Sequence, residues 1–255
     1  MPQWLVLVYA GLVGAAIGSF LNVCIYRLPE GESVVSPRSR CPSCGTMIGW
    51  RDNIPIVSYL LLRGRCRVCG LRISPQYPLV ELVTALIWVG AAVRHGLSWQ
   101  TLSVAVFLTL LLGIALTDAR SYIIPDEFSL GGLAVGIALA FTSAPPSIGQ
   151  ALAGAALGFG LLYLAGALGE WWMEKPAMGG GDIKMMAMVG AFLGPIGAVL
   201  TIFLGALVGT IIFLPIALRT GKLVPFGIFL AVGAAVTQAF GGTIVDWYRA
   251  EMLGM

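Results

Sequence analysis

Long apolar runs are the feature that most restricts how this chain can fold. A helix needs roughly 20 apolar residues to cross the hydrocarbon core of a bilayer, where each backbone amide must form its hydrogen bond within the segment. Runs of this kind recur along the chain, bounded by charged residues, proline or polar clusters. They cover residues 4–26, 77–93, 101–117, 128–143, 148–168, 183–193, 196–218 and 224–240. The pattern predicts an all-α polytopic membrane protein with about eight transmembrane helices.

The sixth run is short, and Gly194-Pro195 separates it from the seventh. A short span can be tilted, and the Gly-Pro break can be a kink rather than a loop. Within the runs, the spacing of Gly14 with Gly18 and of Gly154 with Gly158 favours close helix packing in lipid.

The composition excludes several other classes of protein. With 58% hydrophobic residues, 11% charged residues and a mean hydropathy of +0.91, the chain has too little polar surface for a water-soluble globule. The sparse charge also excludes a disordered chain, an acidic tail and a basic tail that coats nucleic acid, so we expect no nucleic-acid partner. No basic residue precedes the first apolar run, which favours a retained span over a cleaved signal peptide.

The basic residues predict the orientation of the spans. With the N-terminus outside, thirteen of the 15 Lys and Arg residues fall on the inside, and only Arg94 and Arg249 lie outside. The reverse orientation opposes the positive-inside bias. The basic residues expected inside are Arg27, Arg38, Arg40, Arg51, Arg63, Arg65, Arg67, Arg72, Arg120, Lys175, Lys184, Arg219 and Lys222.

One sizeable polar segment interrupts the apolar pattern, at residues 27–76. This insertion domain holds eight of the 15 basic residues and four of the five cysteines. We therefore predict three parts: a first transmembrane helix in residues 1–26, a cytoplasmic insertion domain in 27–76, and a transmembrane core in 77–255.

The four cysteines of the insertion domain form two CxxC pairs, Cys41 with Cys44 and Cys66 with Cys69, and 21 residues separate the pairs. This spacing is typical of two knuckles that supply four thiolates to a structural zinc ion. A glycine follows each pair and suits a tight turn. Two disulfides or a redox pair are the competing interpretation, but a cytoplasmic location keeps thiols reduced and favours zinc.

Two acidic residues stand at the ends of predicted spans, where a charge is costly and tends to be functional. Asp118 ends the third span and Asp182 begins the sixth, so the expected topology places both at the cytoplasmic edge of the bilayer. Neighbouring carboxylates can share a proton, so that one acts as a base toward water and the other as an acid toward a carbonyl. Each residue alone also suits a structural role, Asp182 as a helix N-cap and Asp118 as a solvated charge beside Arg120.

Three glycines, Gly179, Gly180 and Gly181, directly precede Asp182. Such a run is expected where an extended substrate backbone must approach a carboxylate without obstruction by side chains. The three glycines are therefore candidate substrate-binding residues.

The remaining polar groups in or near spans have weaker assignments. Asp126 opens the fourth span, a position typical of an N-cap. Glu81 lies about one turn into the second span, where it could pair with an inside arginine, and receives no role. His95, the only histidine, falls in a short outside loop, so a Ser or Cys nucleophile would lack a histidine base.

In their order along the chain, these motifs resemble the bacterial type IV prepilin peptidases (leader peptidase and N-methyltransferase), a branch of the GxGD membrane aspartyl proteases. The resemblance covers nearly the whole chain, with minor departures at Gln76, where arginine is common, and at Met185, where leucine is common. It rests on residues 18–23 (GSFLNV), 26–29 (YRLP), 50–55 (WRDNIP), 62–66 (LRGRC), 77–81 (YPLVE), 124–126 (IPD), 179–184 (GGGDIK) and 225–227 (PFG), together with Asp118 and both CxxC pairs.

The resemblance implies that Asp118 and Asp182 are the catalytic pair of a transmembrane aspartyl peptidase core, whereas Asp126 is not the acid that activates water. It implies that short basic leaders are removed from type IV prepilins or type II secretion pseudopilins at the cytoplasmic face of the bacterial inner membrane. The new N-terminal residue would then be methylated with S-adenosylmethionine as the donor.

The methyl donor rests on the resemblance alone, because the sequence contains no GxGxxG fingerprint. Its site stays unassigned, with the insertion domain as the expected contributor, although the arginines of this domain could instead bind anionic lipid headgroups. Two other interpretations remain open. One is a protease without methyl transfer, and the other is a membrane scaffold or transporter that uses its aspartates for protons.

The helix ends predict different roles for the two aspartates. Asp118 lies at the C-terminal end of its predicted helix and Asp182 at an N-terminal end, so the helix dipole favours ionisation of Asp182 and opposes that of Asp118. We expect Asp182 to act as the base toward water and Asp118 to carry the shared proton.

Overall fold

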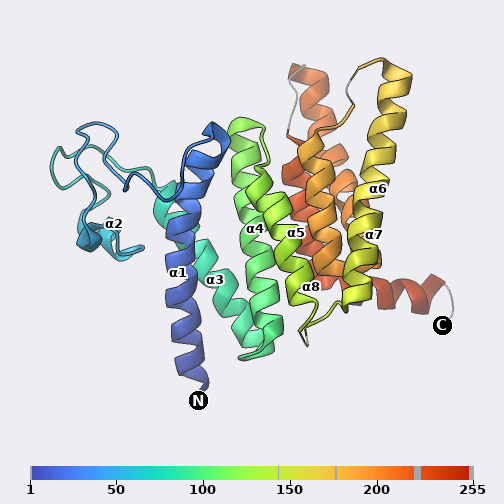
Figure 1. The fold of residues 1–255 in the computed structure, drawn as a ribbon, viewed down its shortest axis with the longest axis horizontal. Coiled ribbons are helices and arrows are strands. Elements are labelled where there is room, and N and C mark those ends of the chain that lie inside the picture. Colours follow the sequence, from blue (N-terminus) through green and yellow to red (C-terminus); the bar gives the residue numbers. More distant parts are fainter. Residues whose placement is uncertain (1, 143, 176, 221–224, 253–255) are drawn as a thin grey trace. The chain divides into compact units, whose positions relative to one another are not determined.

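The computed structural model describes residues 2–142, 144–175, 177–220 and 225–252 (Figure 1). The chain divides into two compact units. Unit 1 is Met1–Ala105 and unit 2 is Val106–Met255. Three residues named above lie outside the described residues: Ser143, which ends the run 128–143; Val224, which begins the run 224–240; and Lys222, which is expected in an inside loop.

In unit 1, α1 (Gln3–Arg27) packs directly against α3 (Gln76–His95). Two glycines of α1 permit this approach: a Cβ atom on Gly14 would lie 2.8 Å from the Cα of Ala85, and one on Gly18 would lie 2.7 Å from the Cα of Glu81. Both distances are too short for real carbon atoms. The close packing predicted from the glycine spacing is therefore confirmed for this helix pair.

The insertion domain between α1 and α3 consists mainly of turns. Its regular elements are η1 (Leu28–Glu30), η2 (Trp50–Asp52) and α2 (Val57–Leu61), and its described residues form isolated β-bridges without a strand. Large apolar side chains such as Val35, Met47 and Trp50 are exposed. A segment with so few buried apolar groups needs a cross-link or a metal to hold it together.

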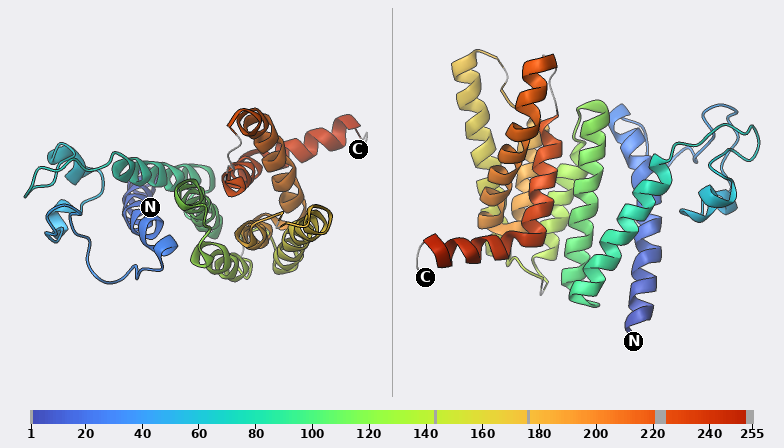
Figure 2. Two further views of the ribbon diagram at one scale, coloured as in Figure 1. Left: turned by 90° about the horizontal axis from the view of Figure 1, so that it is seen from above. Right: turned by 180° about the vertical axis from the view of Figure 1, so that it is seen from behind.

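Unit 2 contains most of α4 (Trp99–Ser121), followed by α5 (Asp126–Leu139), α6 (Ile148–Met173), α7 (Gly180–Thr220) and α8 (Phe226–Met252). The helix α7 packs against α5, α6 and α8 (Figures 1 and 2). Its first half is the centre of the unit, since Met185, Met186, Met188 and Val189 are fully buried.

The chain reverses direction within α7. Gly194 has φ 71° and ψ −177°, outside the helical region. A Cβ atom on Gly158 of α6 would touch both Met186 and Ala198, which in a straight helix would be about 18 Å apart. The helix is therefore a hairpin with limbs 180–193 and 195–220, so the Gly-Pro break separates the sixth and seventh runs by a turn.

The second limb of α7 runs antiparallel to α8. Thr201 hydrogen-bonds to Thr237 over 3.3 Å, and Gly233 lies against Gly205. The beginning of α8 consequently lies at the same end of unit 2 as the beginning of α7.

The multi-pass prediction is confirmed. Within the described residues, six helices are long and apolar enough to cross a membrane, namely α1, α3, α4, α6, α7 and α8. The eight apolar runs map onto these six, with α7 containing two runs, and onto α5, which has 14 residues.

In unit 2, α6 packs closely on α7 where Gly154 and Gly190 meet backbone to backbone. We predict that Gly154→Ala destabilises the protein by about 1–3 kcal/mol, because the added methyl group would overlap the Gly190 carbonyl oxygen. Thermal unfolding in detergent measures the change. The matched control is Gly160→Ala in the same helix, where a Cβ meets open space and no loss is expected; equal melting temperatures for both variants would contradict the packing.

Candidate functional site

Asp118 lies near the C-terminal end of α4 and is 5% exposed. Its Oδ2 atom accepts a hydrogen bond from the backbone N–H of Ile228, in the first turn of α8, over 3.1 Å. A helix N-terminus presents unpaired N–H groups that bind carboxylates. Asp118 is therefore held between the end of one helix and the beginning of another.

Asp182 is the third residue of α7, so it lies inside the helix and not at the N-cap position considered from sequence. Its side chain is half-buried. The Asp118 carboxylate interacts with it electrostatically, although the two residues are 64 positions apart. The reversal of α7 and the antiparallel course of α8 bring both carboxylates to one end of unit 2.

The three glycines before Asp182 have different surroundings. A Cβ atom on Gly179 would lie 3.2 Å from Asp182 Oδ2, and one on Gly181 would lie 3.0 Å from Ile124 Cβ. A Cβ atom on Gly180 would meet open space, and both Gly179 and Gly180 are exposed. The backbone beside Asp182 is therefore accessible over these two residues, while Gly181 permits helix packing.

Ile124 and Gly227 join the helices that carry the aspartates. A Cβ atom on Gly227 would lie 2.7 Å from Asp118 Oδ2 and 2.8 Å from Ile124 Cδ1. The same isoleucine contacts the position of Gly181 in α7. Only glycine at 227 lets the N-terminus of α8 approach the Asp118 carboxylate, which gives a structural reason for the PFG motif at residues 225–227.

Asp126 forms an ion pair rather than capping its helix. Pro125 occupies the N-cap position of α5, and both oxygens of Asp126 accept hydrogen bonds from Lys184 Nζ, at 2.7 and 2.9 Å. The N-cap expected at this residue is therefore wrong. The ion pair connects the first turn of α5 to the first turn of α7, two residues beyond Asp182.

Two neighbouring carboxylates beside an accessible backbone can perform hydrolysis without a histidine or a metal. One carboxylate takes a proton from water while the other donates a proton to the carbonyl oxygen. This chemistry requires that the two groups interact strongly enough to share a proton.

The four cysteines of the insertion domain meet in one cluster. The Sγ atoms of Cys41, Cys44, Cys66 and Cys69 all lie within 4.8 Å of one another, and none of these residues is in a disulfide. Cys41 and Cys69, from different pairs, have Sγ atoms 3.7 Å apart. Tetrahedral zinc with Zn–S bonds of roughly 2.3 Å requires sulfurs about 3.8 Å apart, so the cluster has the size of a four-thiolate zinc site.

Both CxxC pairs adopt the same local fold. In the first, Cys41 N–H donates to Thr46 O and Gly45 N–H to Cys41 O; in the second, Cys66 N–H donates to Leu71 O and Gly70 N–H to Cys66 O. Each glycine has a positive φ, 70° and 71°, a conformation that glycine adopts without strain. These are two equivalent knuckles.

The environment of Cys44 favours the thiolate that zinc binds. Hydrogen bonds with Thr46 lower the pKa of the Cys44 thiol to about 6, and the bond with the Thr46 side chain has a larger effect than the bond with its backbone. Nearby, Arg67 of the second knuckle binds both oxygens of Asp52, at 2.6 to 3.0 Å, and lowers the pKa of this carboxyl. This ion pair ties the second knuckle to η2.

Glu81 has a partner that the sequence did not indicate. Its Oε2 atom accepts a hydrogen bond from the backbone N–H of Ile56 over 2.7 Å, whereas an arginine partner was considered. Ile56 has φ 62°, an unusual value for a β-branched residue. No local pattern would have revealed this contact.

Two family models match the chain. Residues 12–95 match the Bacterial Peptidase A24 N-terminal domain, and residues 105–214 match the Type IV leader peptidase family. The first match contains all four clustered cysteines, and the second contains both aspartates. No solved structure matches the chain significantly.

Curated relatives carry the name prepilin leader peptidase/N-methyltransferase. The chain is 38% identical to that of Myxococcus xanthus over 218 residues, which is 86% of this chain and 65% of the relative. It is 34% identical to that of Aeromonas hydrophila over 278 residues (98% and 96%) and 34% identical to that of Bacillus subtilis over 248 residues (95% and 98%).

We predict that the purified protein contains about one zinc ion per chain, because four thiolates of tetrahedral size occupy one cluster. Metal analysis by mass spectrometry measures this content. Cys44→Ser should lower it strongly, whereas the matched control Cys24→Ser, in α1, should not. A natively folded wild-type protein without metal would end the assignment.

Proposed function

The chain belongs to the type IV leader peptidase family, and we propose that it cleaves leader peptides from type IV prepilins or type II secretion pseudopilins and then N-methylates the new N-terminal residue. The observation that carries the peptidase assignment is the arrangement of the helix ends that bear Asp118 and Asp182 at one end of unit 2, where Ile124 lies against both Gly181 and Gly227. The methyltransferase assignment rests on the names of the relatives.

In the proposed mechanism, Asp182 is the base and Asp118 carries the shared proton. Asp182 takes a proton from water as the water oxygen adds to the carbonyl carbon, and Asp118 gives its proton to the carbonyl oxygen. When the C–N bond of the intermediate breaks, the leaving nitrogen receives the proton held by Asp182, and Asp118 recovers its own. The Ile228 N–H contact occupies Asp118 Oδ2, so Oδ1 is the atom assigned to the proton.

The substrate backbone would approach over Gly179 and Gly180. Both residues are exposed, and a Cβ atom at Gly180 meets only open space. Side chains here would obstruct an extended peptide near the Asp182 carboxylate. This supports the glycines as substrate-binding residues.

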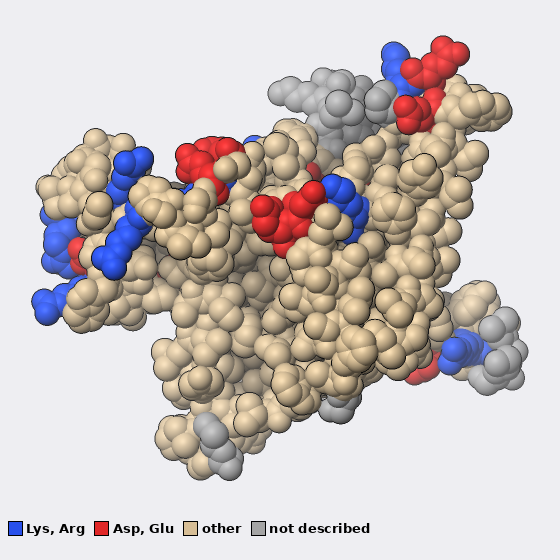
Figure 3. Space-filling model, in the orientation of Figure 1, with Lys and Arg blue, Asp and Glu red and all other residues tan. Residues whose placement is uncertain are grey.

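The proposed location is the bacterial inner membrane, with the N-terminus outside and the insertion domain and aspartates on the cytoplasmic side. The positive-inside bias supports this orientation. Figure 3 shows Lys and Arg side chains gathered on the insertion domain, a distribution that also suits contact with anionic lipid headgroups.

The four cysteines would hold zinc as a structural ion. Four thiolates complete a tetrahedral coordination sphere, so the ion would have no position for water or substrate. Its contribution would be to cross-link the two knuckles of a domain that buries few apolar side chains. The donor set therefore supports folding of the insertion domain and not catalysis at the metal.

The proposed methyl donor is S-adenosylmethionine, which supplies an electrophilic methyl group on a sulfonium. The new N-terminal amine must first lose a proton, because only its lone pair can form the bond to this methyl group. Because the sulfonium of the donor is positively charged, the site that binds the donor must accommodate a cation.

We predict that Asp118→Asn and Asp182→Asn each lower prepilin cleavage by at least about 1,000-fold, because neither amide can exchange a proton with its partner. Cleavage in detergent or vesicles, followed by mass analysis of the product, measures this loss and any methylation.

The matched control is Asp126→Asn, the same substitution at the residue that pairs with Lys184. This ion pair is partly exposed and should contribute little, so cleavage should fall by only a few fold. Cleavage that survives both Asp118→Asn and Asp182→Asn would falsify the aspartyl mechanism. A cleaved product that is never methylated would favour the protease-only alternative.

We also predict that Gly227→Ala lowers cleavage by about 10-fold or more while the protein stays folded, because the methyl group would displace the Asp118 carboxylate. The matched control is Gly242→Ala in the same helix, where a Cβ meets open space. The same cleavage assay, read beside thermal unfolding, compares the two variants; equal rates would show that the close approach at Asp118 does not matter.

A further inference from the structure

A cavity of about 540 Å³ lies in unit 1, between the ends of α1 and α3 and the insertion domain. Its volume is within the usual range for small-molecule sites, roughly 300–1,000 Å³. Several motif residues that the peptidase chemistry does not use line this cavity, among them Asn22, Asp52, Asn53, Tyr77 and Glu81.

Two buried acceptors line this cavity, and one of them, the Asn22 amide oxygen, lacks a partner among the described residues. Asn22 is 1% exposed; its amide nitrogen donates to Gly18 O and Tyr77 O, but its Oδ1 atom has no hydrogen-bond partner among the described residues. Glu81 is 8% exposed, and its carboxylate forms no ion pair within the described part of the chain. A buried acceptor without a donor costs roughly 1–3 kcal/mol, so a ligand that donates hydrogen bonds is expected here.

Aromatic side chains form another part of the lining. The rings of Tyr26 and Tyr77 stack with centroids 5.4 Å apart and an angle of 7° between their planes. Such faces attract cations and planar rings. The cavity therefore combines hydrogen-bond acceptors, two carboxylates and aromatic surface with four arginines, Arg27, Arg40, Arg67 and Arg72. Arginines bind carboxylates and the acceptors bind ammonium groups, so this set suits a ligand that carries both groups together with a heteroaromatic ring.

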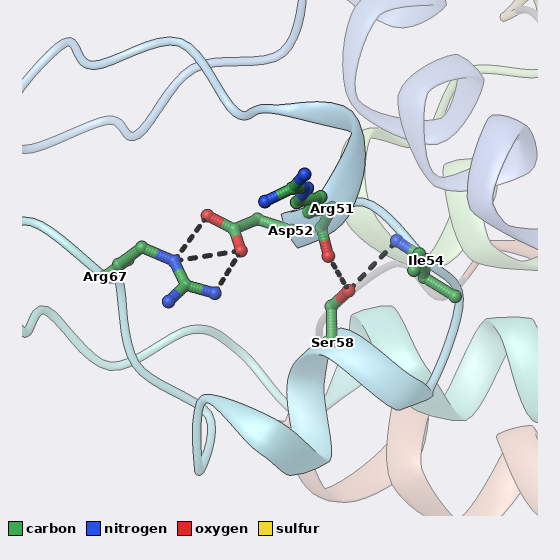
Figure 4. Close-up of polar contacts among 5 residues, drawn as sticks. All are labelled: Arg51, Asp52, Ile54, Ser58 and Arg67. Carbon is green, nitrogen blue, oxygen red and sulfur yellow. Dashed lines mark hydrogen bonds and ion pairs between the residues drawn. The ribbon is translucent and has the colours of Figure 1, made fainter.

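The wall that the insertion domain contributes is held in place by its own hydrogen bonds (Figure 4). Ser58 is 6% exposed; it donates to Arg51 O and accepts from Ile54 N–H. These contacts position the strained Ile56, whose N–H binds Glu81. A positive φ in isoleucine persists only when its surroundings fix it, so Glu81 is oriented in advance of any ligand.

We propose that this cavity binds the sulfonium methyl donor, with Glu81 and Asn22 accepting hydrogen bonds from its α-ammonium group. S-adenosylmethionine has the required parts, namely an α-ammonium group, an α-carboxylate, a sulfonium and an adenine ring. The inference rests on the proposed methyltransferase activity and assigns that activity to unit 1. A cationic amine could also come from the new N-terminus of the cleaved substrate, and the experiment separates the two.

The test is calorimetric binding to the full chain in detergent, with S-adenosylmethionine, S-adenosylhomocysteine or a short peptide that begins with an unmethylated phenylalanine. Wild type should bind both adenosyl ligands in the absence of peptide. Glu81→Gln, which keeps an oxygen for Ile56 N–H but removes the charge, should weaken both by about tenfold or more. The matched control Glu30→Gln, at an exposed residue of η1 outside the cavity, should bind like wild type.

A second measurement needs no variant. S-adenosylhomocysteine should slow amide hydrogen exchange in peptides covering residues 50–59 and 74–84 of the wild-type protein. Three outcomes would overturn the assignment. The first is protection from exchange only in other segments, and the second is unchanged affinity for the adenosyl ligands in a folded Glu81→Gln variant. The third is a wild-type protein that binds the peptide but neither adenosyl ligand. A wild-type protein that neither binds donor nor methylates cleaved product would instead refute the proposed methyltransferase function.

Discussion

The reversal of the chain at Gly194 is the constraint on which the rest of unit 2 depends. Without it, the two limbs of α7 would extend along one axis, and α8 would begin far from Asp118. With it, the N-termini of α7 and α8 both lie near the end of α4. The reversal is possible because α6 has glycines where the two limbs of α7 pack against it. The backbone of α6 can therefore lie directly on the backbone of α7.

Unit 1 reaches its structure by a different route. Its helix pair packs through glycines in the same way, but the insertion domain has little apolar interior and is organised by two knuckles and a few hydrogen bonds to unusual backbone positions. A domain of this kind can present polar groups inward at low cost, because no tightly packed core has to exclude them. The buried carboxylate of Glu81 is consistent with such a setting.

The sequence predicts what depends on short stretches of residues. Apolar runs predict the spans, and the CxxC pairs predict the cysteine cluster, because both follow from local periodicity or spacing. It does not predict contacts between distant segments that involve backbone groups. The Asp118 contact joins residues 110 positions apart and uses an N–H group, which every residue other than proline carries. The partner of Glu81 depends on the backbone angle of Ile56, and the Asp126–Lys184 pair bridges 58 positions. The catalytic, metal and substrate roles of the named residues stay predictions that the geometry supports.

Ile124 has a consequence for how related sequences can vary. Its side chain fills the space beside Gly181 and also reaches Gly227, so one residue in a connecting segment sets how closely two helix N-termini approach each other. At position 181 the three atoms nearest to an added Cβ all belong to this isoleucine. A chain with a smaller residue at 124 would tolerate alanine at 181, whereas position 227 would still be limited by the Asp118 carboxylate. Compensating exchange between 124 and 181, with invariance at 227, is the pattern of variation that this geometry permits.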